Sequence, residues 1–495
     1  MTLSRRDFLK LGGLVATSAA LSACSPSLFQ RAAGRPALVS WGPLDAANFT
    51  ALNRLSFGPG SAERARFAQI GLQAWVEEQL APETIDDFDC DLRLEAFDTL
   101  KLKAYELADM SSQLFDNVDR ETVPDELRRA TLLRQVYSRR QLYEVMTEFW
   151  SDHLNISTEK GDCYYLKTVD DREVVRKYAL GSFRDLLWAS AHSPAMLVYL
   201  DNQANHKGAP NENYAREVME LHTLGVHGGY SQQDVMELAR CLTGWSVKEH
   251  FWTGDFIFNQ DLHDTGSKSV LGATIQNAGE SEAESVLARL AEHPSNAQFI
   301  ATKLARRFLA DPPPAAIVEK AARAYTQTKG DIRAVLRVIL LDGLPLAAPR
   351  YKRSVNFVAS ALRMLGAETD AGPAVQDYLL RLGQMAFKWP TPDGYPDRDG
   401  AWQGNLMPRW QFAFALVRGE LENTQIDLRE LQSVSGAKSL PESLDALGSL
   451  LLGAPLAPAV RDALIAAMRS AGASEEEALA VLAGGILASP AFQWR

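Results

Sequence analysis

Residues 211–225 read NENYAREVMELHTLG and residues 231–242 read SQQDVMELARCL, and these two stretches decide the fold. In the first stretch, apolar residues recur at helical spacing until Gly225 ends the pattern. The second stretch begins with Ser231, whose hydroxyl can cap a helix that carries Asp234 at its third position. The sequence therefore predicts two consecutive α-helices joined by a short turn.

The same helical spacing recurs along most of the chain, so we predict an all-α fold with few or no strands. Alternation typical of strands occurs only as weak candidates at 255–258 and 269–271. We expect one large domain or two tightly packed lobes, with a lobe boundary or a functional insertion in the loop-rich residues 246–280. The expected helices cover 46–55, a segment from residue 62, 91–116, 124–154, 182–191, 195–200, 211–224, 232–242, 281–293, 296–310, 312–328, 331–342, 352–366, 373–387 and 408–420.

The first 24 residues carry two export signals. Arg5 and Arg6 belong to the motif SRRDFLK, a twin-arginine signal that directs export of folded proteins. An apolar run follows and ends in the lipobox LSAC, so we expect cleavage before Cys24 and lipid attachment to its thiol. The alternative is a buried or membrane-spanning helix over residues 8–23, but this run is short for a span.

These signals also predict the order of segments and the location of the protein. We expect a signal peptide at 1–23, a flexible tether at 24–45 and a helical body at 46–495. The twin-arginine export machinery would be one partner. The protein should reside in the periplasm or cell envelope, held at a membrane by the lipid on Cys24.

The composition indicates an ordinary globular body with an acidic surface. Hydrophobic residues make up 46% of the chain and charged residues 23%, and the formal charge is −11, or −13 without the net +2 of the leader. Such a surface repels phosphate backbones, so we expect no nucleic-acid partner. Apart from Cys24, the widely spaced Cys90, Cys163 and Cys241 are expected to be mostly buried, with one disulfide an open alternative.

The helix at 211–224 contains the densest group of residues suited to chemistry. Glu217 and Glu220 share one helical face, whereas Glu220 and His222 point apart. This spacing differs from that of E-x-x-H helices, whose ligands converge on one ion. A divalent metal ion bound here would therefore use Glu217 and Glu220, with further ligands from other helices.

Residues 144–155 could supply those ligands, because Glu148 and Asp152 share a face there and His153 lies on another. Carboxylates from two helices around one ion would resemble a carboxylate-bridged metal site in a bundle. The open alternative is that the carboxylates pair with arginines and that His153 and His222 are hydrogen-bonded core residues. The arginines considered for such pairing are Arg139, Arg140, Arg172, Arg176 and Arg216.

A third candidate lies in the loop-rich segment, where DLHDTG contains His263 and Asp264. A histidine next to a carboxylate could act as a base or bind a cation, but the aspartates could equally form Asx turns. A fourth cluster consists of aromatic residues that either stack on a ligand or pin a long loop to the body: Trp389, Tyr395, Trp402 and Trp410. G-x-S-x-G, P-loop, dinucleotide and C-x-x-C-H motifs do not occur, so common hydrolase, kinase, dehydrogenase and haem functions lack support.

Five motifs in order make the sequence similar to a bacterial family called domain of unknown function 1800. They are LNRLSFGPG (52–60), FWSDHLN (149–155), the 211–225 helix with GGY (228–230), LTGW (242–245) and SPAFQ (489–493). The resemblance runs from about residue 46 to the C-terminus and implies a large, mostly helical exported protein. It also implies a neighbouring exported family that resembles alkaline phosphatases and sulfatases, and it carries over no catalytic residues.

Two hypotheses follow. The first is a lipid-anchored envelope protein that binds or supports a partner, such as the phosphatase-like exported protein. The second is a metal-dependent enzyme in which carboxylates hold a divalent ion and a histidine moves a proton. Its candidate residues are Glu148, Asp152, His153, Glu217, Glu220, His222, His263 and Asp264. Carboxylates that converge around a pocket would favour the enzyme, and carboxylates paired with arginines would favour the binding protein.

Overall fold

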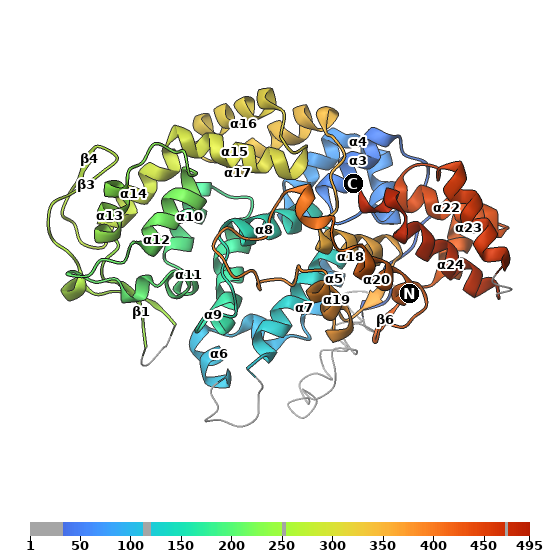
Figure 1. Cartoon of the computed structure of the whole chain (residues 1–495), viewed down its shortest axis with the longest axis horizontal. Coiled ribbons are helices and arrows are strands. Elements are labelled where there is room, and N and C mark those ends of the chain that lie inside the picture. Colours follow the sequence, from blue (N-terminus) through green and yellow to red (C-terminus); the bar gives the residue numbers. More distant parts are fainter. Residues whose placement is uncertain (1–32, 112–119, 250–253, 471–473) are drawn as a thin grey trace.

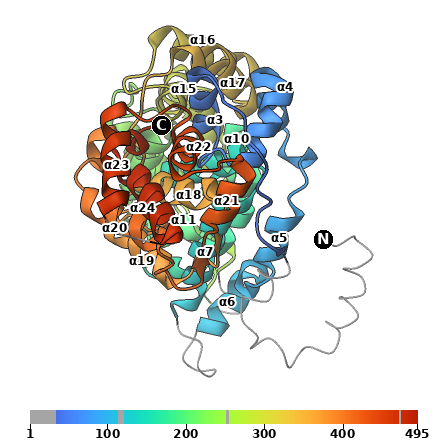
Figure 2. The same cartoon turned by 90° about the vertical axis from the view of Figure 1, so that its right-hand side faces the viewer.

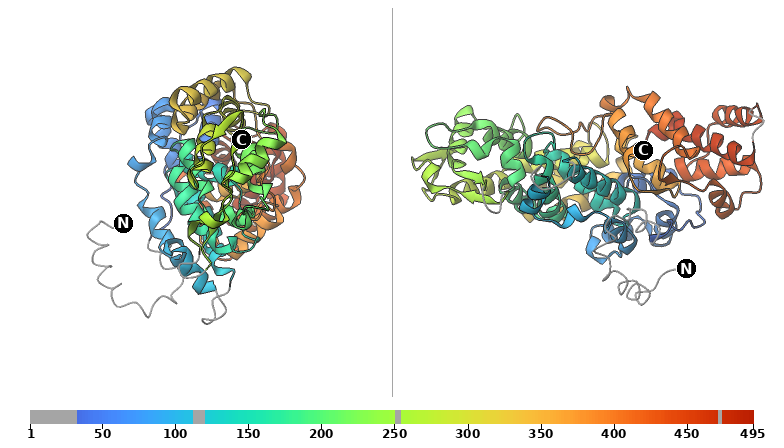
Figure 3. Two further views of the ribbon diagram at one scale, coloured as in Figure 1. Left: turned by 90° about the vertical axis from the view of Figure 1, so that its left-hand side faces the viewer. Right: turned by 90° about the horizontal axis from the view of Figure 1, so that it is seen from below.

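The computed structural model describes residues 33–111, 120–249, 254–470 and 474–495 (Figure 1). The twin-arginine motif, the lipobox and Cys24 lie outside the described residues. The described chain forms an elongated body whose two ends are built from different parts of the sequence (Figures 1 and 3). None of the described helices has both the length and the apolar character needed to cross a membrane.

One end of the body contains five helices and two small hairpins (green in Figure 1). The hairpins pair β1 with β2 and β3 with β4, both antiparallel, and they lie within the loop-rich residues 246–280 apart from Trp245 at the start of β1. The strand candidates at 255–258 and 269–271 are therefore confirmed, within one residue at their ends. The elements are α10 (Phe183–Ala191), α11 (Pro194–Tyr199), α12 (Glu212–Glu217), α13 (Gln232–Cys241), β1 (Trp245–Val247), β2 (Phe256–Phe258), β3 (Lys268–Val270), β4 (Ala273–Ile275) and α14 (Ser281–Glu292).

The middle of the body holds the helix that organises the candidate site. This helix, α8, lies at the centre of the view in Figure 1, and α15 to α17 run along the top. The elements are α5 (Phe88–Leu94), α6 (Ala104–Ser111), α7 (Thr122–Tyr137), α8 (Gln141–His153), α9 (Cys163–Asp170), α15 (Pro294–Phe308), α16 (Ala315–Thr328) and α17 (Ile332–Val338).

The other end combines the first described helices with the C-terminal third of the chain, as Figure 2 shows from that side. β5 and β6 form one more short antiparallel pair there. The elements are α3 (Ala46–Leu55), α4 (Ser61–Gln79), α18 (Ser354–Met364), β5 (Glu368–Thr369), α19 (Pro373–Arg381), α20 (Leu406–Val417), β6 (Thr424–Gln425), α21 (Leu428–Ser435), α22 (Leu440–Leu452), α23 (Pro458–Ser470) and α24 (Glu475–Ala488).

The predicted all-α fold class is confirmed. The described residues form 22 α-helices, and their strands are limited to the three short antiparallel pairs. One continuous cluster of buried hydrophobic side chains extends from α3 to the last described helical turn. Cys90, Cys163 and Cys241 are buried free thiols, and the latter two belong to this cluster, as expected of small core residues.

Two long helices predicted from periodicity are each divided in the structure. The predicted 91–116 helix is interrupted between Leu94, where α5 ends, and Ala104, where α6 begins, and residues 112–116 lie outside the described residues. Within the interruption, the N–H and hydroxyl of Thr99 donate to Glu126 at 3.2 and 2.6 Å. The predicted 124–154 helix breaks between α7 and α8, where Ser138 Oγ and the Arg139 N–H each donate to Asp87 at 2.7 Å. The second break arises because a distant carboxylate captures polar groups that would otherwise continue the helix.

The helix that follows Asn211 also departs from a plain α-helix. After α12 the backbone forms a π-helical turn, η5 (Val218–Thr223), in which the Leu224 N–H donates to Met219 O, five residues earlier, at 2.8 Å. Such turns insert one residue into the helical register and often mark functional positions. In the next helix the predicted cap is confirmed, because Ser231 and Asp234 form a complete capping box.

Candidate functional site at the end of the central helix

Two carboxylates of α8 lie together with two buried arginines from distant segments. Arg353 donates to Asp152 at 2.6 Å and lies 3.2 Å from Glu148, while Arg307 donates to Glu148 at 2.9 Å and lies 3.5 Å from Asp152. The arginine side chains are 2–3% exposed and the carboxylates 10–15%. Each carboxylate therefore contacts both cations in a nearly water-free setting, where such contacts are strong.

The same arginines extend the network to a loop near residue 397. Arg307 Nε donates to Asp397 at 3.0 Å, and Arg350 donates to Asp397 and, at 2.7 Å, to Asp399. Burial alone would raise the pKa of Asp397, but Arg307 and its neighbouring arginines outweigh burial and hold that pKa well below its usual range. Asp152 shows the opposite balance, because burial raises its pKa despite Arg353.

A small cavity follows the polar face of α8. Its volume is about 50 Å³, and its lining includes Thr147, Glu148, Ser151, Asp152, Asn155 and Tyr395. A water molecule occupies roughly 30 Å³ in the liquid, whereas pockets for small organic ligands measure roughly 300–1,000 Å³. The cavity has room for very few water molecules, and an organic substrate would not fit beside the carboxylates.

A loop covers the end of α8. Asn155 donates to the carbonyls of Trp389 and Thr391 at 3.0 and 2.8 Å, and Tyr199 donates to that of Pro390 at 2.9 Å. Gly394, with φ +70°, brings its Cα so close that an added Cβ would lie 2.0 Å from the Asp152 carbonyl.

The aromatic residues of this loop pack against one another and pin the loop to the body, which is one of the two alternatives that the sequence left open. Trp389, Tyr395 and Trp402 pack together, with ring centroids 5.0 and 6.2 Å apart, and join a small buried cluster with Tyr351. Trp410 lies apart from them, 41% exposed, and its indole N–H donates to Ala488 O.

His153 and His222 come together behind the carboxylates. His153 Nε2 lies 2.9 Å from the His222 carbonyl, which can only accept, so Nε2 carries the proton. His153 Nδ1 is then the acceptor for Lys303 Nζ at 2.8 Å. Burial and the nearby Lys303 lower the pKa of His153, in agreement with a neutral ring.

Lys303 is a functional candidate that the sequence reasoning missed. Burial lowers its pKa to about 8, although Asp152 and Asp397 oppose that effect. Its only sequence signal is its place on α15 between Phe299 and Arg307, each four residues away. His222 differs from His153, because its buried ring nitrogens have no hydrogen-bond partner among the described residues, and burial with Lys303 lowers its pKa to about 3.

Glu217 and Glu220 do not join the α8 carboxylates. Burial and the adjacent Glu220 raise the pKa of Glu217, and the ion pairs of the described residues include neither glutamate. Glu148, Asp152, Glu217 and Glu220 also form no three-ligand group in the described part of the chain. Of the arginines considered from the sequence, Arg176 does pair with a carboxylate of α8, Glu144.

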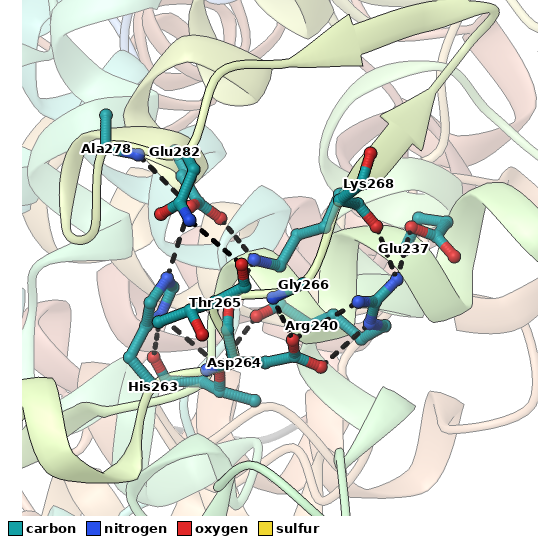
Figure 4. A network of polar contacts seen from close by, with 12 residues as sticks. Glu237, Arg240, His263, Asp264, Thr265, Gly266, Lys268, Ala278 and Glu282 are labelled. Carbon is teal, nitrogen blue, oxygen red and sulfur yellow. Dashed lines mark hydrogen bonds and ion pairs between the residues drawn. The ribbon is translucent and has the colours of Figure 1, made fainter.

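His263 and Asp264 belong to a separate network beside the β3–β4 hairpin, far from α8 (Figures 1 and 4). Asp264 binds Arg240 through two hydrogen bonds of 2.8 and 3.2 Å and accepts from the Gly266 N–H at 2.8 Å, which is an Asx turn. The Arg240 hydrogen bonds lower the pKa of Asp264 to about 2, although burial opposes them.

His263 is buried in the same network (Figure 4). Its Nδ1 donates to Thr243 O at 2.8 Å, and its Nε2 lies 3.4 Å from Glu282, which also binds Lys268 at 2.6 Å. These side chains are at most 1% exposed. The predicted site residues thus divide into one central and one peripheral group, and both are built largely from internal pairs.

Comparison with known proteins gives a family and nothing more specific. The chain belongs to the family described as "Protein of unknown function (DUF1800)", whose sequence model matches residues 50–494. No protein with a curated description and no solved structure matches the chain.

Proposed function

We propose that this member of the DUF1800 family is an exported cell-envelope protein, anchored by lipid on Cys24, that binds and supports a partner protein. The twin-arginine and lipobox motifs support export and anchoring. The phosphatase-like exported protein implied by the family resemblance is the partner we propose to test first.

The observation that carries this proposal is the pairing of Glu148 and Asp152 with Arg307 and Arg353. Carboxylates held by two buried arginines are already neutralised, and a cavity of about 50 Å³ leaves no space for a substrate beside them. This arrangement supports a structural role for the central network. It favours a binding function over catalysis at α8.

The surface near the C-terminus offers a place for a partner. Met407 and Trp410, at the start of α20, are 60% and 41% exposed, and Trp494 is 40% exposed. The two segments adjoin, because Trp410 donates to Ala488 O and Arg409 donates to Gln493. Exposed large apolar side chains on adjoining segments are a feature of protein interfaces.

A pull-down with the phosphatase-like exported protein tests the proposal. We expect the full chain to retain that protein, and Met407→Asp to weaken retention at least tenfold because it places a charge on the apolar surface. Val226→Asp is the matched control, since Val226 is 63% exposed and lies in the turn before α13, which Figure 1 places at the opposite end of the body from α20. Failure of the parent chain to bind at micromolar concentration would refute this partner.

Export and anchoring need a separate experiment in cells. We expect a Cys24→Ser chain to lose incorporation of a labelled fatty acid and to leave the membrane fraction, and an Arg5→Lys, Arg6→Lys chain to remain in the cytoplasm. Membrane retention of the Cys24→Ser chain would refute the lipid anchor.

The second candidate function is a metal-dependent enzyme that uses Glu217 and Glu220. It is favoured by one observation: burial and the neighbouring Glu220 raise the pKa of Glu217, and a cation shared by the two carboxylates would relieve their repulsion. Elemental analysis of the exported protein and of a Glu217→Ala, Glu220→Ala variant tests it. A parent protein without stoichiometric metal would rule this function out.

A further inference from the structure

His192 and two glutamates of α14 form a compact group of potential metal ligands. His192 is the residue that ends α10, Glu280 immediately precedes α14, and Glu284 lies in its first turn. One ligand atom from each of the three lies within 4.8 Å of the other two. In the described part of the chain no other three residues of these types come so close. The group uses none of the residues predicted from the sequence.

The hydrogen bonds of His192 direct one ring nitrogen toward the glutamates. Its Nδ1 lies 2.8 Å from the Trp188 carbonyl, which only accepts, so Nδ1 carries the proton. Nε2 therefore has a free lone pair, is buried, and has no hydrogen-bond partner among the described residues. A ligating histidine is commonly fixed in this way, with one ring nitrogen bound to a carbonyl and the other to the metal.

Carboxylate oxygens of the glutamates, which are also hydrogen-bond acceptors, lie next to the Nε2 lone pair. Nε2 of His192 lies 3.4 Å from Glu284 Oε1, so two lone-pair atoms face each other at close range. Glu280 and Glu284 are four residues apart and so share a side of the helix. Either a proton or a cation must lie between these atoms to make the contact favourable.

Aromatic side chains hold the group in place. Trp188 stacks on His192 with centroids 4.1 Å apart, and Trp245 and Phe256 lie 4.4 and 4.8 Å from the ring. The indole N–H of Trp188 also donates to Glu284 Oε1 at 3.2 Å, so one tryptophan orients both the histidine and a carboxylate. Such outer contacts fix ligands at the geometry an ion requires.

We propose that His192, Glu280 and Glu284 bind a divalent transition-metal ion of the zinc class. One imidazole nitrogen and two carboxylates suit Zn²⁺, whereas Mg²⁺ and Ca²⁺ prefer oxygen ligands alone. Three protein ligands leave a fourth position for water, and the side chain of Glu284 is 35% exposed, so an ion can enter from solvent. This site does not depend on the proposed partner or on Glu217 and Glu220.

Titration of the chelator-treated full chain with Zn²⁺ and Co²⁺ tests the site. We expect one ion per chain by calorimetry, a visible Co²⁺ absorption spectrum, and quenching of tryptophan fluorescence by Co²⁺ because Trp188 and Trp245 flank His192. Glu280→Gln and Glu284→Gln should each weaken Zn²⁺ binding at least tenfold, and the double variant should abolish the quenching.

Glu292→Gln is the matched control, because Glu292 also belongs to α14 but forms an ion pair with Arg184 at the surface. It should bind Zn²⁺ as the parent does, and circular dichroism should show that all variants are folded. The proposal would be overturned if the parent chain gave no saturable Zn²⁺ binding. Equal affinity in the parent and in the Glu280→Gln, Glu284→Gln variant would overturn it as well.

Discussion

Replacing Arg353 by methionine would leave two buried carboxylates with one cation between them. Arg353 is 3% exposed and contacts both Asp152 and Glu148. Removing one partner of a buried ion pair costs about 3–5 kcal/mol, because the remaining charge stays desolvated. Arg307 still lies 2.9 Å from Glu148 and 3.5 Å from Asp152. We therefore expect Arg353→Met to lower the free energy of unfolding by about 3 kcal/mol, at the low end of that range.

A second substitution, Asp152→Asn, tests whether the loss of stability comes from an unpaired charge or from lost packing. Asp152→Asn removes the carboxylate that Arg353 contacts at 2.6 Å, so in the Asp152→Asn, Arg353→Met double variant Glu148 keeps Arg307, which also binds Asp397, as its counter-ion. We expect the Asp152→Asn, Arg353→Met double variant to be at least about 1 kcal/mol more stable than the sum of the two single-variant losses predicts, since neighbouring charges couple by roughly 0.5–3 kcal/mol.

Urea unfolding followed by circular dichroism measures these differences, or the unfolding rate does if refolding is incomplete. Arg333→Met is the matched control, because Arg333 also forms two hydrogen bonds to a carboxylate, that of Glu83, but at an exposed surface. Such a pair contributes about 0–1 kcal/mol. An Arg353→Met effect no larger than that of Arg333→Met, or strict additivity in the double variant, would contradict the buried-pair reasoning.

Three further predictions follow from the same region. Gly394→Ala should cost at least about 2 kcal/mol in urea unfolding, because its Cβ would meet the Asp152 carbonyl at a positive φ, whereas Gly400→Ala in open space should cost under about 0.5 kcal/mol. The unfolded chain protonates His222 more readily than the folded chain, whose pKa is about 3, so stability should fall as the pH drops from 6.5 toward 3. His222→Phe should reduce that slope by up to about 1.4 kcal/mol per pH unit, and an unchanged slope would contradict the assignment. Lys303, with a pKa of about 8 in place of 10.5, should make stability rise between pH 8 and 10.5, and Lys303→Met should remove that rise in the same urea titration.

Local features of the fold could be predicted from the sequence because their causes lie within a few residues. The Ser231 capping box joins residues three apart, and the strand at Phe256–Phe258 shows its own alternation. The break between α7 and α8 could not be predicted, because Asp87 reaches it from about 50 residues away. Periodicity indicates which side of a helix is polar, but it does not reveal which distant group competes for that side.

The candidate site shows the same difference between local features, which could be predicted, and distant partners, which could not. The shared face of Glu148 and Asp152 could be predicted from their spacing, and so could their pairing with arginine as an alternative. The identities of Arg307 and Arg353 could not, because both lie more than 150 residues along the chain. In the proposed cation site, Glu280 and Glu284 are spaced as a pair, but His192 joins them only through the packing of α10 against α14.

The central network also constrains the order in which this protein can fold during synthesis. Glu148 and Asp152 emerge early, yet their partners Arg307 and Arg353 follow much later, and Asp397 and the pinning residue Gly394 later still. Until residue 353 has left the ribosome, Glu148 and Asp152 lack one of their counter-ions, and until residue 397 has left it Arg307 lacks Asp397. Long-range contacts of this kind fold slowly and late. The proposed export route carries folded proteins. A nearly complete chain must therefore be synthesised before the centre of the molecule is folded and the protein can be exported.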